Sequence, residues 1–301
     1  MDGIILIDKI KDITSYDVIR RTKKHFHIDK VGHCGTLDPF ATGLLIIGIN
    51  QATKVMSFMQ HDYKEYIAKV KLGSSTDSYD LTGNVISTSD INKFSKETLI
   101  EVLNSFVGKI KQTPPIYSAI QIDGKRLYDY ARNNESVEIP EREVDIYKLE
   151  LISYSDDEFE IYVKCSMGTY IRTLGVDIAK KLNNDGHLSE LRRVSIGDVN
   201  VSKANSYQDL LDGNINVLDI RDFIDFKNIT TTDVKILTRV YNGQTIILKK
   251  EVDDMLLIVD AEIDKVCAVY KKSDKECFYN CYRGLYNEDI RFKRLEELKE
   301  K

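Results

Sequence analysis

Two stretches of the chain alternate between apolar and polar residues, which is the pattern of a strand with one buried face. In Tyr63–Gly73 the apolar face begins at Tyr66 and continues through Ala68 to Leu72. Glu158–Ser166 shows the same period of two. We therefore predict two half-buried strands, and we expect the ring of Tyr66 to point to the apolar side of the first.

Apolar residues at helical spacing predict three helices in the same part of the chain. Thr14 followed by Asp17 resembles a capping box, which would open a helix that runs to Lys24. A second helix is expected within Ser95–Gly108, with its cap at the serine, and a third over Ile171–Leu182. Because strands and helices do not alternate regularly, an α+β fold is favoured over a doubly wound α/β fold.

The texture of the sequence changes beyond about residue 230. Charged turns separate short strand-like runs over Thr245–Leu248, Met255–Val259 and Val266–Tyr270. This is typical of a small β-rich domain of roughly 70 residues. We therefore divide the chain into a mixed domain of residues 1–230 and a β-rich domain of residues 231–301, which ends in a charged helical or frayed tail at Arg291–Lys301.

Charge and composition do not by themselves indicate a function. Hydrophobic residues make up 42% of the chain and charged residues 30%, as in an ordinary globular protein. The net charge of −5 counts against a nucleic-acid partner, since such proteins usually carry a basic surface. Basic residues do cluster at Arg20–Lys24, Lys180–Lys181 and Arg192–Arg193, but a solvated helix face is the simpler interpretation of each cluster.

The N-terminal segment and the cysteines suggest a cytoplasmic protein with reduced thiols. Ile4–Ile7 is a short apolar run without a preceding basic segment, so it does not resemble a signal peptide, and no stretch is long enough to suggest a membrane span. The five cysteines have poor spacing for zinc, and no histidine pair lies near them. We expect neither a metal nor a disulfide.

The segment Gly32–Leu45 offers the clearest chemistry. It reads Gly-His-Cys-Gly-Thr-Leu-Asp-Pro-Phe-Ala-Thr-Gly-Leu-Leu. Pro39 restricts Asp38 to extended conformations, and Gly35 and Gly43 allow sharp turns on either side. The carboxylate would then sit on a stiff loop among small or apolar residues, where its pKa can be tuned. An aspartate that only makes a turn is the alternative, and it is the commoner role of an Asp-Pro pair.

This segment resembles the signature of bacterial tRNA pseudouridine synthases of the T-loop class, G-H-x-G-x-L-D-P-x-A-x-G-x-L, and matches it at every fixed position. The resemblance implies that Asp38 is the catalytic residue and that His33 fills the space left in the RNA when the target base is extruded. Without it, His33 would be read as a packed loop histidine. It also implies a pseudouridine synthase fold, with a central, mostly antiparallel mixed sheet, and a PUA-like RNA-binding domain at the end of the chain.

Later segments extend the resemblance to about residue 230. Lys64-Glu65-Tyr66 is similar to the family's K-x-Y segment, whose tyrosine stacks on the target uracil and is proposed to take the C5 proton. On its own, Tyr66 would be read as a core aromatic. Cys165–Leu174 matches the motif C-S-x-G-T-Y-I-R, which implies that Arg172 pairs with Asp38 and that Tyr170 helps to build the pocket.

Two further segments suggest residues that bind the substrate. Leu191-Arg192-Arg193 resembles the family's L-R-R segment, which implies that Leu191 lies in the pocket wall and that both arginines lie near phosphate. The family usually begins with D-K-P-x-G-x-T-S, whereas Asp8–Ser15 lacks the proline and the glycine. Lys9 is retained and is expected to bind substrate, but the backbone turn here must be made differently.

The resemblance predicts an enzyme that isomerises uridine to pseudouridine in the T-loop of tRNA, at position 55 in the usual tRNA convention. Such an enzyme must flip the base out of its stack, and the reaction needs no cofactor because no redox or group transfer occurs. tRNA is the expected partner, and a monomer is the expected state. The alternatives are a noncatalytic RNA-binding or tRNA-folding protein and an aspartate-based hydrolase. The hydrolase would need a second carboxylate, which only folding could supply from Asp77 or Asp80.

Overall fold

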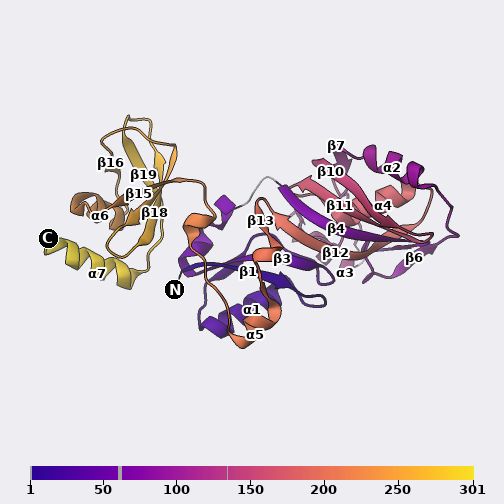
Figure 1. The fold of residues 1–301 in the computed structure, drawn as a ribbon, viewed down its shortest axis with the longest axis horizontal. Helices are drawn as coiled ribbons and strands as arrows, with labels where there is room; N and C mark the ends of the chain where they lie inside the picture. The colour runs from indigo at the N-terminus through magenta and orange to yellow at the C-terminus, as the bar shows by residue number, and fades with distance from the viewer. Residues whose placement is uncertain (1, 60–62, 134) are drawn as a thin grey trace.

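The computed structural model describes residues 2–59, 63–133 and 135–301. Within them the strands form a ten-stranded sheet, a five-stranded sheet and two small two-stranded ribbons. The molecule is elongated, with the five-stranded sheet at one end and the larger sheet across the middle and the other end (Figure 1). No described helix is both long and apolar enough to cross a bilayer. The α+β class predicted from the sequence is confirmed.

The large sheet is mixed but mostly antiparallel, as expected. Its main path runs β14-β1-β3-β12-β4-β11-β10-β7, and only the β1–β14 and β3–β12 pairs are parallel. The strands of this path are β1 (Gly3–Lys9), β3 (Thr42–Ile49), β4 (Tyr63–Leu72), β7 (Gly108–Gln112), β10 (Arg142–Tyr154), β11 (Glu158–Ser166), β12 (Gly186–Ile196) and β14 (Asn205–Ser206). Off the path, β2 (Val31–His33) pairs with β3 and β13 (Val199–Asn200) pairs with β12.

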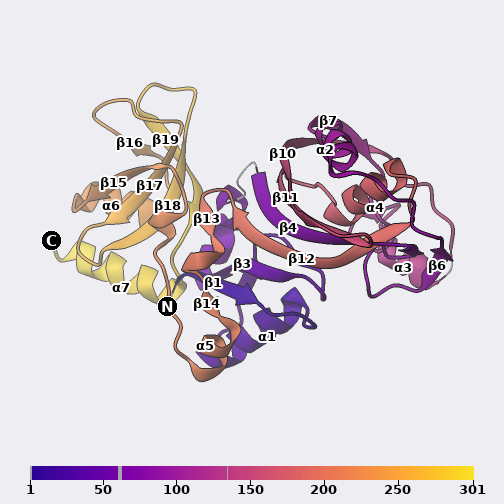
Figure 2. The same cartoon turned by 45° about the vertical axis from the view of Figure 1, so that its right-hand side comes forward.

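Strand β12 joins the two halves of this sheet, and Figure 2 shows it passing between β4 and β3. It pairs with β4 along most of its length and with the start of β3 at Arg192 and Arg193. Arg193 therefore lies opposite Tyr66 on one side and opposite Gly43 on the other. A Cβ on Gly43, whose φ is +105°, would lie 2.2 Å from the carbonyl oxygen of Arg193. Glycine is needed here because the two backbones approach so closely.

Helices cover the sheet on several sides (Figure 1). α1 and α5 pack near β1, α4 packs on β4 and β12, and α2 packs on β10. These helices are α1 (Ser15–Phe26), α2 (Lys96–Asn104), α4 (Ile171–Lys181) and α5 (Tyr207–Asp212). The connections contain the ribbons β5 (Ser74–Thr76) with β6 (Val85–Thr88) and β8 (Gln121–Ile122) with β9 (Lys125–Arg126), helix α3 (Leu127–Arg132), and the 3-10 helices η1 (Asn50–Met59), η2 (Val201–Lys203) and η3 (Ile220–Asp222).

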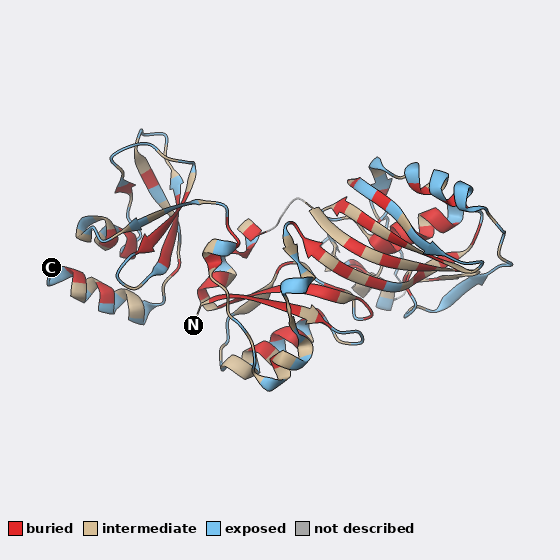
Figure 3. Ribbon diagram, in the orientation of Figure 1, coloured by how far each residue is buried: buried red, intermediate tan, exposed pale blue. Residues whose placement is uncertain are grey.

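Most local predictions for this part of the chain are confirmed. Thr14 forms the capping box with Asp17, and α1 continues slightly beyond the predicted end to Phe26. The alternation in β4 and β11 buries one face of each strand, which packs against α4 (Figure 3). Helix α2 begins after Ser95 as predicted but ends before Gly108, because that glycine, with a φ of +104°, already begins β7.

The second sheet lies at the C-terminal end, in the order β15-β17-β18-β19-β16. Its elements are β15 (Lys227–Thr231), α6 (Val234–Tyr241), β16 (Ile246–Ile247), β17 (Met255–Asp260), β18 (Lys265–Lys272), β19 (Phe278–Gly284) and α7 (Glu288–Lys299). Its first strand thus begins a few residues before residue 231. The charged tail is a packed helix, because Arg294 of α7 is buried and pairs with the buried Asp260 at 2.9 Å.

Candidate active site

The loop that carries Asp38 is held by the first residue of α1 and by the turn that precedes this helix. Ser15 Oγ donates to the carbonyl of Leu37 at 3.1 Å and accepts from its amide at 2.9 Å. The amide of Asp12 donates to the carbonyl of Pro39 at 2.9 Å. These bonds, together with the buried side chain of Leu37, hold the carboxylate on a stiff support, as predicted.

The turn that supports this loop resolves the departure noted in Asp8–Ser15. Asp12 occupies the position at which the family pattern has glycine, and its φ is +65°. Aspartate is one of the few residues other than glycine that tolerates this left-handed conformation. The backbone is therefore left-handed at a residue where the family pattern has glycine, and Asp12 makes the turn in its place.

Arg172, in the first turn of α4, pairs with Asp38. Its Nε lies 3.0 Å from Asp38 Oδ2, and its Nη2 donates to Asp38 Oδ1 at 3.3 Å. Nη1 donates to Asp80 Oδ2 at 3.3 Å and to the carbonyl of Ser78 at 2.9 Å, and Nη2 also donates to the carbonyl of Tyr117 at 2.9 Å. One buried guanidinium thus fastens three loops that are far apart in the sequence.

Asp80 is a second carboxylate of the site that the sequence left undecided. It is buried, and its Oδ1 accepts bonds from Ser78 Oγ at 2.9 Å and from Thr82 N at 2.9 Å. With its remaining oxygen on Arg172, Asp80 has no free face toward a substrate. It can orient the arginine, but it cannot serve as the second acid or base that a hydrolase would need.

Two opposing effects act on the Asp38 carboxyl. Burial raises its pKa above the ordinary value, and the neighbouring Arg172 acts to lower it. One third of the Asp38 side chain is nevertheless exposed to the pocket. We take the two-pronged pair with Arg172 to favour the ionised carboxylate, because both of its oxygens receive charge-assisted bonds.

A pocket of about 290 Å³ opens in front of the Asp38–Arg172 pair. This volume is close to the lower end of the range for small-ligand sites, about 300 Å³. Three of the predicted site residues line its wall together with the pair: Tyr66, Tyr170 and Leu191. The remaining lining residues are Thr36, Leu37, Lys64, Ser118, Ala119, Gly168, Thr169 and Ile171. A planar base could lie in this space with its ribose close to Asp38.

Tyr66 is almost completely buried, on the apolar face of β4 as predicted. Burial raises the pKa of Tyr66 to about 12, and the guanidinium of Arg193 beside the phenol opposes the rise. The phenol is therefore neutral at neutral pH. The positive charge of Arg193 stabilises the phenolate form of Tyr66 and so favours loss of the phenolic proton.

Arg193 does not occupy the expected position near phosphate. Its side chain is fully buried, and its guanidinium donates to the carbonyls of Leu44 at 2.8 Å, Gly35 at 3.1 Å and Thr36 at 3.4 Å. The central position of β12 places Arg193 under the Asp38 loop, where its side chain has no exposed surface, and the phosphate contact stays a prediction. Arg193 instead supports the loop and the Tyr66 phenol.

Lys9 differs from its expected role for a similar reason. Its side chain is fully buried, and its ammonium donates to the carbonyls of Ile13 at 2.8 Å, Ile10 at 2.9 Å and Pro39 at 3.2 Å. Burial lowers the pKa of Lys9 to about 8. In this structure Lys9 has no exposed surface and holds the backbone beneath the Asp38 loop, and the substrate contact stays a prediction.

Two other predicted residues lie outside the pocket wall. Arg192 pairs with Asp8 at 2.6 Å and keeps part of its side chain exposed, so it is open to a phosphate. His33, at the end of β2, does not line the pocket, and burial lowers its pKa. Its Nδ1 is buried and has no hydrogen-bond partner in the described part of the chain.

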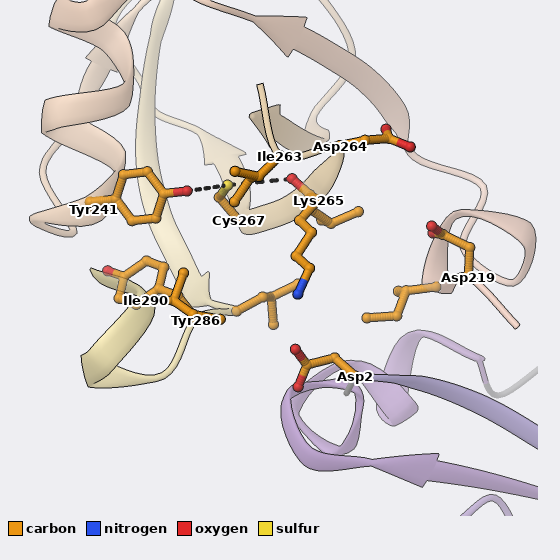
Figure 4. A pocket seen from close by; sticks show the side chains of 12 residues that line it. Asp2, Asp219, Tyr241, Ile263, Asp264, Lys265, Cys267, Tyr286 and Ile290 are labelled. Carbon is orange, nitrogen blue, oxygen red and sulfur yellow. Dashed lines mark hydrogen bonds between the residues drawn. The ribbon is translucent and has the colours of Figure 1, made fainter. Parts of the chain in front are cut away.

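A second pocket, of about 160 Å³, lies where the C-terminal sheet meets the start of β1 (Figure 4). Asp2 comes from the N-terminal side and Asp264 and Lys265 from the C-terminal side. Tyr241 and Cys267 hydrogen-bond to each other at its inner wall. No group of three or more acidic, cysteine or histidine side chains suited to a metal is found among the described residues.

The comparisons with known proteins agree with this geometry. A chain in the crystal structure of a Cbf5-Nop10-Gar1 complex superimposes with a TM-score of 0.68 at 21% identity, covering 96% of this chain and 86% of that one. A chain in the structure of an H/ACA RNP bound to a substrate RNA gives 0.67 at 20% identity, covering 95% and 86%. These likenesses show the fold, which is that of the pseudouridine synthases.

Sequence relatives are closer. The model of the TruB family pseudouridylate synthase (N terminal domain) matches residues 23–171. The tRNA pseudouridine synthase B of Mycoplasma capricolum subsp. capricolum is 39% identical over 295 residues, 96% of this chain and 98% of the relative. That of Caldanaerobacter subterraneus subsp. tengcongensis is 40% identical over 247 residues, 82% and 86% of the two chains. The chain belongs to the TruB family of pseudouridine synthases.

Proposed function

We propose that this protein isomerises uridine to pseudouridine in tRNA, at the T-loop uridine in position 55. The supporting observation is the ion pair of Asp38 with Arg172, which opens on a pocket walled by Tyr66. The relatives named tRNA pseudouridine synthase B support the reaction and the RNA class. The T-loop position rests on the resemblance of the Gly32–Leu45 segment.

The reaction breaks the N1–C1′ bond, turns the uracil over and joins C5 to C1′. C5 loses a proton and N1 gains one, so the product is an isomer and no oxidant is consumed. A stacked base cannot turn over in place, and flipping it out costs a few kcal/mol. The pocket then supplies an aromatic wall in Tyr66 and a fixed carboxylate in Asp38 close to the sugar.

We assign the chemical step to Asp38, which acts either on the C1′ carbon or on a ribose proton. Arg172 and Asp80 position it, and the arginine keeps it ionised. Tyr66 stacks on the uracil, and its phenol takes the C5 proton while its own proton passes to N1, so that the proton count balances. The nearby guanidinium of Arg193 favours the transient loss of the phenolic proton. Tyr170 and Leu191 complete the wall of the pocket.

The C-terminal domain is proposed to bind RNA outside the pocket. The five-stranded sheet begins with β15 (Lys227–Thr231), so we propose that the boundary expected between residues 1–230 and 231–301 lies a few residues earlier, and we assign the second part as a PUA-like domain. Arg192 is proposed to bind a phosphate, since its guanidinium is partly exposed. With tRNA as substrate, we expect a monomer that works in the cytoplasm.

The decisive experiment measures tritium release from C5-tritiated uridine in unmodified tRNA. The wild-type protein is compared with Asp38→Asn and with Asp90→Asn, an exposed carboxylate, as a matched control. We expect release from the wild type and the control, and loss of release by at least about a thousandfold in Asp38→Asn with tRNA binding retained. Binding without release by the wild type would instead favour the noncatalytic RNA-binding alternative.

A further inference from the structure

Lys64 has a position that the proposed mechanism does not use. It lies two residues before Tyr66 on β4, so both side chains leave the strand on the same face, about 7 Å apart along the strand. Both line the pocket in front of Asp38. The Lys64 ammonium therefore faces the space in which a base against Tyr66 would keep its sugar and phosphates.

The Lys64 ammonium has no counter-ion. Within residues 2–59, 63–133 and 135–301 no hydrogen bond or ion pair holds its Nζ, although the side chain is more than half buried. The nearby guanidinium of Arg193 makes this position still less favourable for the charged ammonium of Lys64. The place that a Cβ on Gly35 would occupy lies 3.0 Å from Lys64 Nζ and 3.6 Å from Arg193 Nη1. Two cations thus converge on one point of the loop.

The charges around the site do not balance. The carboxylates that act there are Asp38 and Asp80, and the cations are Lys9, Lys64, Arg172 and Arg193. Four cations against two carboxylates leave a formal excess of two positive charges. Arg172 pairs with both carboxylates. Lys9 is hydrogen-bonded to three carbonyls, and the carboxylates of Asp12 and Asp17 also act on it, so the positive charge without a carboxylate partner lies at Lys64 and Arg193.

A partly buried cation without a partner is unfavourable, and the molecule shows the effect. Burial lowers the pKa of Lys64 to about 8, and the charge of Arg193 acts in the same direction, while the thiols of Cys165 and Cys34 act weakly against it. A neutral uracil would not relieve this excess of charge. A phosphate would, and an RNA nucleotide in the pocket carries one on either side of its ribose.

We propose that Lys64 binds the phosphate of one of the two linkages that flank the flipped uridine, and so positions its ribose against Asp38. The proposal rests on the proposed function for the identity of the ligand. Lys64 is thereby a positioning residue whose ion pair forms only when RNA is bound. In the free protein its charge stays unpaired but is already held at the position where the phosphate binds.

The first test compares Lys64→Met with Lys71→Met, which removes a lysine from the opposite face of the same strand. Binding of a synthetic T-arm RNA is measured over a range of salt concentrations. We expect Lys64→Met to weaken binding about tenfold and to reduce the salt slope by about one, and Lys71→Met to change the affinity less than about twofold. Equal effects of the two changes would overturn the proposal.

The second test neutralises the phosphate instead of the lysine. A methylphosphonate replaces the linkage on the 5′ or the 3′ side of the target uridine. In the wild type one of the two replacements should weaken binding about tenfold, and in Lys64→Met the same replacement should have no further effect. If both replacements weaken the variant as much as the wild type, Lys64 does not bind either phosphate and the proposal is wrong.

Stability and turnover separate this contact from other roles. Lys64→Met should raise the melting temperature of the free protein, because it removes an unpaired, partly buried charge. A lower melting temperature without coupling to the linkages would identify a structural role and overturn the proposal. A slower tritium release at saturating RNA, with affinity and salt slope unchanged, would place the ammonium on the base instead. Binding without any tritium release by the wild type would refute the proposed reaction, while the linkage experiment would still measure the contact.

Discussion

The replacement of Arg172 by lysine tests whether the site depends on the shape of the guanidinium or only on its charge. In the structure Arg172 reaches four different groups: the carboxylates of Asp38 and Asp80 and the carbonyls of Ser78 and Tyr117, at 2.9 to 3.3 Å. These acceptors lie around a planar fork. A lysine ammonium keeps the charge but presents three donors from a single point, so it cannot reach all four.

The expected magnitude follows from the contacts that are lost. If lysine retains Asp38 and one neighbour, two buried acceptors lose their donor, at a cost of about 1–3 kcal/mol each. Arg172→Lys should therefore lower the free energy of unfolding by about 2–6 kcal/mol. Because the Asp38 carboxylate is no longer held at both oxygens, its misplacement should slow the reaction by roughly a hundredfold or more.

The assay combines urea unfolding with single-turnover tritium release under saturating RNA, which separates chemistry from binding. Arg20→Lys, in an exposed pair with Asp17, is the matched control and should change neither quantity. If Arg172→Lys unfolds within about 0.5 kcal/mol of the wild type and reacts within about threefold of it, charge alone is sufficient. The role assigned to the fork would then be wrong.

Three more predictions concern groups around the site. Tyr66→Phe keeps the ring but loses the hydroxyl beside Arg193, so RNA binding should stay within about twofold while tritium release falls at least tenfold; unchanged release would show that the phenol does not move the C5 proton. Gly43→Ala places a Cβ 2.2 Å from a carbonyl oxygen and should destabilise the protein by more than about 3 kcal/mol, measured by urea unfolding; a loss below about 1 kcal/mol would contradict the close pairing of β3 with β12. The pKa of Lys9 is lowered to about 8 in the folded protein, so the unfolded chain binds more protons between pH 8 and about 10.5, and the stability of the wild type should increase over this range by more than that of Lys9→Met. Parallel stability curves for the two proteins would show that Lys9 does not titrate as expected.

Local features of the sequence predicted the elements of the fold well. The alternation in Tyr63–Gly73 placed Tyr66 on the buried face of β4, and the pair Thr14 and Asp17 marked the start of α1. Both depend on residues close together in the chain, so their physics is visible without the fold. The end of α2 was less well predicted, because the helix ends at Asn104 although Phe106 still packs against the core, and the chain then turns into β7 at Gly108, where φ is positive.

The roles of the charged residues near Asp38 could not be read from sequence alone. Lys9 and Arg193 belong to segments with an RNA-binding resemblance, yet both are fully buried supports of the Asp38 loop. Asp80 belongs to the site only because the fold brings its carboxylate next to Arg172. In the sequence, Lys64 is notable only as part of the segment that contains Tyr66, and no role of its own is predicted for it. In each case burial and partner are set by strands that are distant in the chain.

The sequence by itself determined the class of the fold, the resemblance to the family and the candidate catalytic residue Asp38, because short-range patterning and a long motif carry that information. The tertiary structure alone decided which cations support the loop and which face the substrate. The deciding feature is the pairing of β12 with both β3 and β4, which buries Arg193 beneath the loop and leaves the ammonium of Lys64 at the pocket wall, with no partner among the described residues. A charged side chain has the same chemistry beneath the loop and at the pocket wall. Its burial and its neighbours decide whether it stabilises the fold or is available to bind a ligand.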